Sequence, residues 1–234
     1  MKTAIMQPYI FPYIGYFQLI NSVDNFIFYD DVHYIKKGWI NRNQILVNNK
    51  AQYFTIPVIK ASQNKLINEI NIDKSSKDYD NILITIKNNY KKAPFYDSVI
   101  PIIEDLLQNR NIVTISDLAI QSILKVLEYL EINKKIFISS QDFSESKGID
   151  KADRLIRITK ESDAQDYINA IGGTEIYNKD YFNEHKINLL FLKPNNIPYK
   201  QFNNKYLPWL SIIDILMFNP PKDILKMLDQ YELI

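Results

Sequence analysis

The chain has 234 residues, 46% of them hydrophobic and 24% charged, an ordinary globular composition that excludes a wholly disordered chain. Its 28 Lys and Arg residues balance 27 Asp and Glu residues, so no overall positive charge attracts nucleic acid, and we expect no nucleic-acid partner. Because there is no cysteine, disulfides, thiolate metal sites and a cysteine nucleophile are excluded, and we expect a cytoplasmic protein.

The N-terminal segment predicts a strand, a loop and a helix. Residues 3–6 are a short apolar run, residues 7–12 are stiffened by two prolines, and residues 14–20 have helical character. Prolines and a glycine interrupt the apolar stretch, which is not typical of a signal peptide. Nowhere do about 18 apolar residues follow one another, so we expect no membrane span.

The next part of the chain predicts more strands. Residues 25–29 form an apolar run that ends at the adjacent acids Asp30 and Asp31. Residues 39–59 contain two β-branched stretches separated by Asn48-Asn49, which predicts a hairpin. Residues 67–72 (INEINI) have isoleucines spaced by polar residues, and we predict a further strand there.

Between residues 78 and 130 the pattern changes to helical. Apolar positions recur at helical spacing and predict three helices. Thr114 or Ser116 is expected to cap the third helix, and Pro94 and Pro101 are expected to punctuate the first two.

The rest of the chain alternates between strands and helices. We predict strands at 135–139, 167–170 and 189–192, helices at 150–160 and near 177–184, and one or two apolar helices at the end of the chain. This alternation indicates an α/β fold: a three-layer-like sheet with a helical insertion at about residues 78–130 and a divergent Rossmann-like N-terminal unit. We expect one domain over residues 1–234, in which the helical subregion could form a second lobe.

The loop at residues 7–16 is the first candidate site. In α/β folds ligands bind where the first strand ends and the following helix begins. Tyr13-Ile14-Gly15-Tyr16 has the spacing of the His-x-Gly-His element of nucleotidylyltransferases, although tyrosine can donate a hydrogen bond but no positive charge. The chain's 16 Tyr and 12 Phe residues predict either an aromatic-walled pocket or an aromatic core. The candidate contacts in this loop are Gln7, Pro8, Tyr9, Tyr13 and Tyr16.

Residues 30–43 are the densest polar cluster of the chain and the second candidate site. Adjacent acids in a strand point to opposite faces, so we expect at most one of Asp30 and Asp31 to face a given cleft, as a general base. A solvated turn with ion pairs at its rim is the structural alternative. The other candidates are Lys36, Lys37 and Arg42 for phosphate, Trp39 for stacking, and Asn41 and Asn43 for hydrogen bonds.

Other parts of the chain carry weaker signals. Lys151 and Arg154 stand one helical turn apart and would present a paired positive face to a substrate or to solvent. His33 and His185 are isolated, so we expect no metal site. Residues 169–173 and 199–201 are weaker candidates for a functional site.

Several motifs stand together in one order along the chain: MQPYIFPYIGYFQLI, DDVHYIKKGWINRN, TIPV, NAIGG and LSIIDILMFN. In this combination the sequence resembles the WbqC-like family over almost its full length, and the first two motifs are specific. His33 stands where glutamine is usual in the family, which weakens the case for a catalytic His33. The resemblance implies a bacterial protein encoded with enzymes for O-antigen and other surface polysaccharides. Some members of the family are labelled glycine transferases.

On this basis we favour an enzyme that modifies an amino sugar, linked to a nucleotide, by N-acyl or aminoacyl transfer. The acyl or aminoacyl donor is unknown. Asp30 or Asp31 would accept a proton from the sugar amine, and Lys37 would bind the diphosphate or the oxyanion. Lys36 and Arg42 would hold the diphosphate, Gln7, Asn41 and Asn43 would orient sugar hydroxyls, and Tyr9, Tyr13 and Trp39 would stack on rings.

Two alternatives remain open from the sequence. One is a non-catalytic protein that binds sugar nucleotides or assists a partner enzyme, which aromatic and amide side chains would fit equally well. The other is a divergent nucleotidyl or adenylate-forming enzyme, to which the Tyr13-Ile14-Gly15-Tyr16 spacing points.

Overall fold

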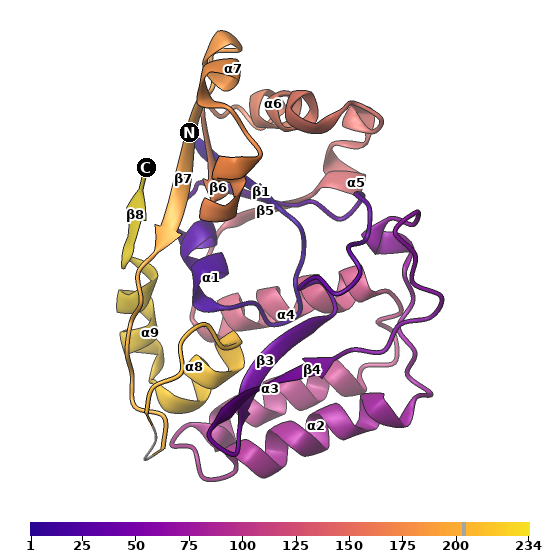
Figure 1. Cartoon of the computed structure of the whole chain (residues 1–234), viewed down its shortest axis with the longest axis vertical. Helices are drawn as coiled ribbons and strands as arrows, with labels where there is room; N and C mark the ends of the chain where they lie inside the picture. Colours follow the sequence, from indigo (N-terminus) through magenta and orange to yellow (C-terminus); the bar gives the residue numbers. More distant parts are fainter. Residues whose placement is uncertain (203–204) are drawn as a thin grey trace.

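A computed structural model of the chain describes residues 1–202 and 205–234. Its main feature is a six-stranded sheet with the strand order β5-β2-β1-β6-β7-β8 (Figure 1). The first five of these strands are parallel, and β8 pairs antiparallel with β7. The strands are β1 (Lys2–Met6), β2 (Asn25–Phe28), β5 (Lys135–Ile138), β6 (Asp166–Ala170), β7 (Asn188–Pro194) and β8 (Tyr231–Leu233).

The strand order sets where a ligand can bind. From β1 the chain moves outward to β2 and β5 on one side, and later to β6 and β7 on the other side. The two halves of the sheet therefore diverge between β1 and β6, at their carboxyl ends. This is the topological switch point at which doubly wound α/β folds place their ligands.

Helices cover both faces of the sheet, which confirms the α/β prediction. One face packs on α1 (Ile14–Asn21), α4 (Ile115–Tyr129), α8 (Ile212–Phe218) and α9 (Pro221–Leu228), and the other on α6 (Lys151–Glu161) and α7 (Lys179–Glu184). Each face of the sheet has its own hydrophobic core, because successive side chains of a strand point to opposite faces. Ala4 lies in the first core and its neighbour Ile5 in the second. The result is three layers, helix, sheet and helix.

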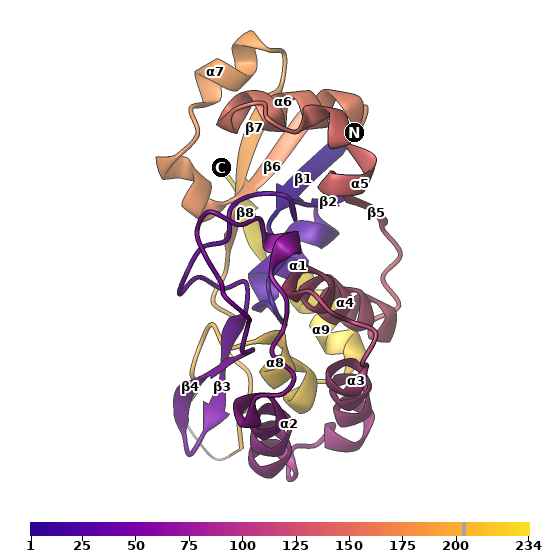
Figure 2. The same ribbon diagram turned by 90° about the vertical axis from the view of Figure 1, so that its right-hand side faces the viewer.

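A large insertion lies between β2 and β5. It contains a separate two-stranded hairpin, β3 (Arg42–Val47) and β4 (Lys50–Thr55), followed by α2 (Lys77–Tyr90), α3 (Tyr96–Gln108) and α4. The turn residues Asn48 and Asn49 have φ of 48° and 65°, as a tight hairpin turn requires. Figures 1 and 2 show α2 and α3 at the end of the molecule opposite α6 and α7.

Short elements complete the chain: the 3-10 turns η1 (Ile67–Glu69), η2 (Ser144–Ser146) and η3 (Ile171–Glu175), and the helix α5 (Ser139–Asp142). The strand predicted at residues 67–72 is therefore wrong. Its isoleucines Ile67, Ile70 and Ile72 are buried, but this segment makes only isolated bridges, of Ile72 with Val58 and of Asn71 with Thr114. Burial of isoleucines between polar residues produced the strand-like pattern without a strand ladder.

Two further predictions concern helix ends. Thr114 caps α4, because its hydroxyl accepts a hydrogen bond from the Asp117 amide at 3.1 Å. Pro94 lies between α2 and α3 as predicted, whereas Pro101 lies inside α3 and does not break it. Pro101 is exposed, so its ring lies on the solvent side of the helix.

Candidate functional site

A pocket of about 710 Å³ lies at the switch point of the sheet, where the loops after β1, β6 and β7 meet the β3–β4 hairpin. Its volume is typical of a small-molecule site. The loop after β1 contributes Tyr9, Pro12 and Tyr13; the hairpin side contributes Trp39, Asn43, Gln44 and Tyr53; and the remaining wall consists of Ile171, Lys193, Pro194 and Trp209. Tyr9, Tyr13, Trp39 and Asn43, which are candidates from the sequence, thus line one pocket, and their contact with a ligand stays a prediction.

The loop after β1 is held in an unusual backbone conformation. Phe11 has a φ of 40°, which is rare for a bulky residue and must be stabilised by its surroundings. Its carbonyl accepts hydrogen bonds from the Asn43 amide and the Ser211 hydroxyl, each at 2.7 Å, and its N–H donates to the Ser122 hydroxyl at 3.0 Å. Three distant segments therefore fix the loop that presents Tyr9 and Tyr13.

Gly15 explains how Tyr13 reaches the pocket. A Cβ atom at Gly15 would lie 2.4 Å from the Tyr13 ring, so the ring folds back over the first turn of α1 where only glycine leaves room. Tyr16 stabilises the loop instead. Its buried hydroxyl donates to the Gln7 carbonyl at 2.9 Å and so connects α1 to the start of the loop. The Tyr-x-Gly-Tyr spacing thus places one tyrosine in the pocket and the other in the core.

Two aromatic pairs form most of the pocket wall. The Tyr13 and Trp209 rings lie 6.1 Å apart, edge to face, and the Trp39 and Tyr53 rings lie 5.9 Å apart. Both tryptophans and Tyr53 are between 42% and 48% exposed, so their ring surfaces remain open to a ligand. Burial and the neighbouring Tyr13 raise the pKa of Tyr9 to about 12, so Tyr9 is a neutral hydrogen-bond donor at neutral pH.

Positive charge lies at the rim of the pocket. Lys193 lines it directly, and the Arg42 guanidinium stacks on the Tyr53 ring at 4.7 Å from the ring centre. Arg42 also donates to the Gly38 carbonyl at 3.2 Å and to the Lys37 carbonyl, which fixes its position. Lys36 and Lys37 are exposed on the same loop as Trp39. An anionic group on a ligand in the pocket would meet these cations.

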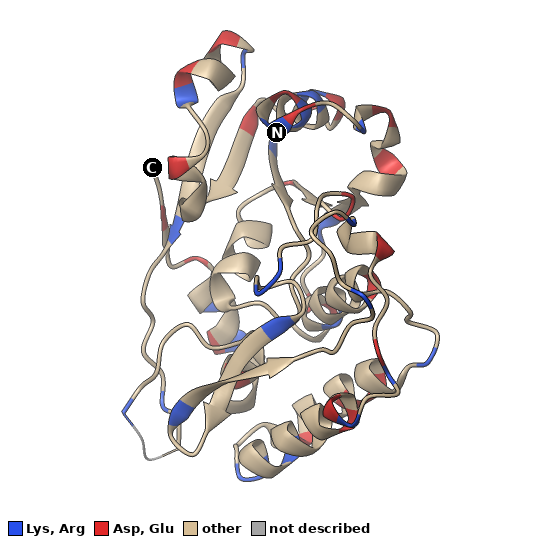
Figure 3. Ribbon diagram, turned by 45° about the vertical axis from the view of Figure 1, so that its right-hand side comes forward, with Lys and Arg blue, Asp and Glu red and all other residues tan. Residues whose placement is uncertain are grey.

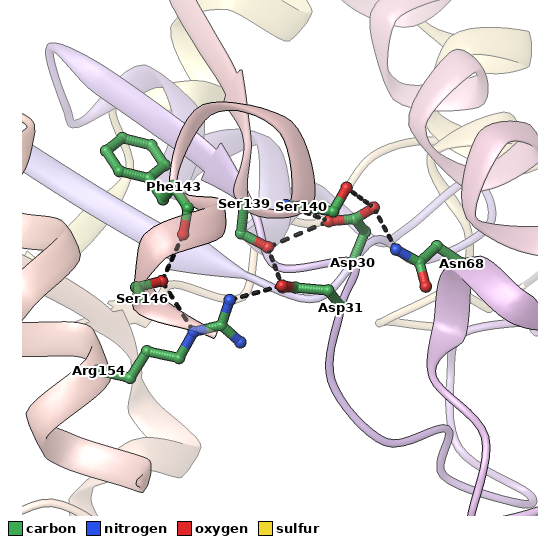
Figure 4. A network of polar contacts seen from close by, with 8 residues as sticks. All are labelled: Asp30, Asp31, Asn68, Ser139, Ser140, Phe143, Ser146 and Arg154. Carbon is green, nitrogen blue, oxygen red and sulfur yellow. Dashed lines mark hydrogen bonds and ion pairs between the residues drawn. The ribbon is translucent and has the colours of Figure 1, made fainter. Parts of the chain in front are cut away.

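Asp30 and Asp31 lie apart from the residues that line the pocket, in a buried polar network at the ends of β2 and β5 (Figure 4). Asp30 accepts hydrogen bonds from the Ser140 amide at 3.0 Å, the Ser140 hydroxyl at 2.7 Å, the Ser139 hydroxyl at 3.1 Å and the Asn68 amide at 3.1 Å. Three donors and the Ser139 hydroxyl, whose single proton is shared with Asp31, therefore stabilise the carboxylate of Asp30, a residue that is 4% exposed.

Asp31 is neutralised by an ion pair. Its carboxylate lies 2.6 Å from the Arg154 guanidinium and accepts from the Ser139 hydroxyl at 2.5 Å. Burial disfavours the charged form of Arg154, but its hydrogen bonds to Asp31 and Tyr29 outweigh burial and raise its pKa. Both acids bond to Ser139, so the expectation that they face opposite sides is wrong: they follow the end of β2, where strand alternation no longer applies.

Two other predicted residues, Asn41 and Asn43, also have structural contacts. The Asn41 side chain accepts from the Tyr34 hydroxyl at 2.7 Å and donates to the Ile56 carbonyl at 2.8 Å, while Asn43 bonds to the loop after β1. The paired positive face predicted for Lys151 and Arg154 is wrong, because Lys151 is exposed whereas Arg154 is buried in the network with Asp31.

A second buried network escaped the sequence reasoning. The Asp214 carboxylate on α8 accepts hydrogen bonds from the Tyr90 hydroxyl, the Tyr199 hydroxyl and the Gln201 amide, each at 2.7 Å. These contacts tie α2 and the segment before Trp209 to α8. The only sequence signal is an acid inside an apolar helix, LSIIDILMFN, where a charge must find partners. Asp214 therefore positions the wall that carries Trp209.

Within residues 1–202 and 205–234, no three His, Asp or Glu side chains converge so that they could hold a metal ion. None of the helices in these ranges has both the length and the apolar character needed to cross a membrane.

Comparison with known proteins links the chain to one family. The profile of the WbqC-like protein family matches residues 7–226. An uncharacterized protein of Mycobacterium tuberculosis is 28% identical over 219 residues, which cover 92% of each chain. No solved structure matches significantly.

Proposed function

This chain belongs to the WbqC-like protein family, and from this premise we propose that it modifies an amino sugar, carried on a nucleotide, by N-acyl or aminoacyl transfer during surface polysaccharide synthesis. The observation that carries the proposal is the aromatic pocket at the switch point of the sheet. Aromatic side chains stack on nucleobases and on the apolar faces of sugar rings. The cations at the rim suit a diphosphate.

In this arrangement the base or sugar would stack between the Tyr13–Trp209 pair and the Trp39–Tyr53 pair. Lys193 and Arg42 would bind the diphosphate, with Lys36 and Lys37 adding charge from the loop. The sugar amine would attack the acyl carbonyl, forming the C–N bond as the bond to the leaving group breaks. Such a reaction needs no protein nucleophile, which suits a chain without cysteine.

The catalytic role of Asp30 and Asp31 stays a prediction, and the geometry favours a positioning role. Both carboxylates are buried and bonded, and they fix the start of the segment that leads from β2 to Trp39. Displacing this segment would displace the hairpin side of the pocket.

A second candidate function is a non-catalytic protein that binds nucleotide sugars. It is favoured by the wall of the pocket, in which the described lining residues include tyrosine, tryptophan, amides and a lysine but no Asp, Glu or His. General acid–base catalysis most often uses those missing side chains.

The two tryptophans provide a direct binding assay. The chain has two Trp residues, and both line the pocket, so ligand entry should change the intrinsic fluorescence. Titration with a panel of nucleotide-linked amino sugars should quench the emission, and Trp39→Phe and Trp209→Phe should each remove part of the signal. Tyr181→Phe, on α7 outside the pocket, is the matched control.

The same panel separates the two candidate functions. Incubation of each bound sugar with activated acyl and aminoacyl donors should give a product whose mass has increased by the acyl group. Saturable binding without any product would favour the binding protein over the enzyme. Fluorescence that none of the nucleotide sugars changes would refute the assignment of the pocket.

A further inference from the structure

Charge is distributed very unevenly along this chain. Residues 32–68 contain six cationic side chains and neither Asp nor Glu, whereas the other residues carry 22 Lys and Arg against 27 Asp and Glu. We call residues 32–68 the cationic face. An acid-free cationic segment within a nearly neutral protein creates a local positive field that favours an anionic partner.

The cationic face is built from segments that contact one another. The Tyr34 amide donates to the Lys65 carbonyl at 2.9 Å, which brings the loop after Asp31 beside the loop before η1. Arg42 joins the first loop to the hairpin through Lys37 and Tyr53. Figure 3 shows the β3–β4 hairpin with cationic segments and without an acidic one.

The charges at this face are free to meet a partner. Lys36, Lys37, Lys50 and Lys60 are exposed, and Arg42 and Lys65 are half-buried. Among residues 1–202 and 205–234, none of the ion pairs involves a cation of this face, and the neighbouring Asp31 is paired with Arg154 instead.

Apolar side chains are interspersed with these cations. Ile35 is 50% exposed, Trp39 42%, Tyr53 46% and Ile59 46%. Trp and Tyr prefer the boundary between lipid headgroups and acyl chains, and Lys and Arg near a bilayer bind anionic headgroups. Transfer of an exposed isoleucine from water into the acyl region is favourable. Nucleic acid is bound mainly through cations and aromatic rings, so exposed isoleucines would contribute little to that binding.

We propose that the cationic face docks on the surface of a membrane that contains anionic phospholipid. Trp39 and Tyr53 belong both to this face and to the pocket wall, so docking brings the mouth of the pocket to the bilayer surface. The proposal is independent of which sugar the pocket takes, because it rests on the cations and on the exposed side chains of the face and not on the identity of the ligand.

Vesicle binding tests the proposal. The full chain should co-sediment with vesicles of phosphatidylglycerol and phosphatidylcholine but not with pure phosphatidylcholine, and high salt should release it because the Debye length shrinks to about 3 Å at 1 M. Each cation near an anionic membrane contributes about five-fold in affinity, so Lys36→Gln/Lys37→Gln should bind about 25-fold more weakly.

A spectroscopic readout shows which surface touches the bilayer. In a Trp209→Phe background the remaining Trp39 should shift its emission to the blue when anionic vesicles are added. The control is Lys179→Gln/Lys186→Gln, which removes two exposed cations around α7, at the opposite end of the molecule from α2. It should bind like the wild type.

Three results would overturn the proposal. They are equal sedimentation with neutral and anionic vesicles, equal weakening by both double variants, and a Trp39 shift with a single-stranded oligonucleotide but not with vesicles. The last result would assign the face to nucleic acid. Quenching by nucleotide sugars in the absence of vesicles tests the pocket separately, so failure of one experiment leaves the other interpretable.

Discussion

Replacing Arg154 by Met should destabilise the fold severely. The change leaves the Asp31 carboxylate, whose side chain is 2% exposed, without its cation, and among the described residues the Ser139 hydroxyl is then its one remaining hydrogen-bond donor. Removing one partner of a buried ion pair typically costs about 3–5 kcal/mol, because the other charge stays desolvated and unpaired. We expect the free energy of unfolding to fall by about this amount.

The same helix supplies a control. Arg157 forms an ion pair with Glu161 at 2.7 Å, close to the 2.6 Å of the Arg154 pair, but its partners are 41% and 37% exposed. Solvent screens such a pair, so Arg157→Met should cost at most about 1 kcal/mol. The two variants lose the same type of side chain from α6 and differ in burial.

Urea denaturation followed by circular dichroism measures both losses. The double variant Asp31→Asn/Arg154→Met should recover most of the stability, because it removes the unpaired charge. The reasoning would be refuted if Arg154→Met lost no more than Arg157→Met, or if the double variant were no more stable than Arg154→Met.

Three further predictions concern other parts of the molecule. Burial raises the pKa of Asp214 against the opposing hydrogen bonds from Tyr199, Tyr90 and Gln201, so the native state keeps a proton that the unfolded chain loses near pH 3.9. As pH rises from about 3.9 through the pKa of Asp214 in the folded state, the free energy of unfolding of the wild type should therefore fall relative to that of Asp214→Asn. Parallel pH profiles of the two proteins would contradict this. Gly15→Ala should push the Tyr13 ring aside and change the Trp209 emission, with little loss of stability because only the far end of the Tyr13 side chain has to move; an unchanged emission spectrum would speak against the packing. Thr114→Ala should cost about 1 kcal/mol through loss of the α4 cap, measured by urea denaturation. Ser116→Ala should cost less, since the Ser116 hydroxyl has no hydrogen-bond partner within the described ranges, and equal losses would argue against the cap.

Local sequence patterns predicted most of the strands and helices. Helical spacing located α2, α3 and α4, and Asn48-Asn49 located the hairpin turn, because these signals depend on neighbouring residues alone. The short strand β8 was missed, since three residues carry too little pattern to stand out. The failure at residues 67–72 has a different cause: burial of isoleucines between polar residues resembles a strand whether or not a partner strand exists.

The position of the pocket was predictable from the sequence, and its lining only in part. Tyr9, Tyr13 and Trp39 lie close to strand ends in the sequence, so a switch-point argument could find them. Lys193 and Trp209 enter the pocket from segments whose position depends on the whole sheet. The bonding of Asp30 and Asp31 depends on Ser139 and Arg154, more than a hundred residues away, and no local pattern records such distances.

The walls of the pocket come from parts of the chain that are far apart in sequence, from Tyr9 to Trp209. Such a cavity exists only when the sheet, the hairpin and the C-terminal segment are all folded together. A ligand that fills it binds the native state and not the unfolded chain, so thermodynamic linkage makes it a stabiliser of the whole fold. At a concentration a hundred times its Kd, such a ligand adds about 2.7 kcal/mol to the free energy of unfolding. The melting temperature of this protein should therefore report any ligand that fills the pocket, whether or not that ligand reacts.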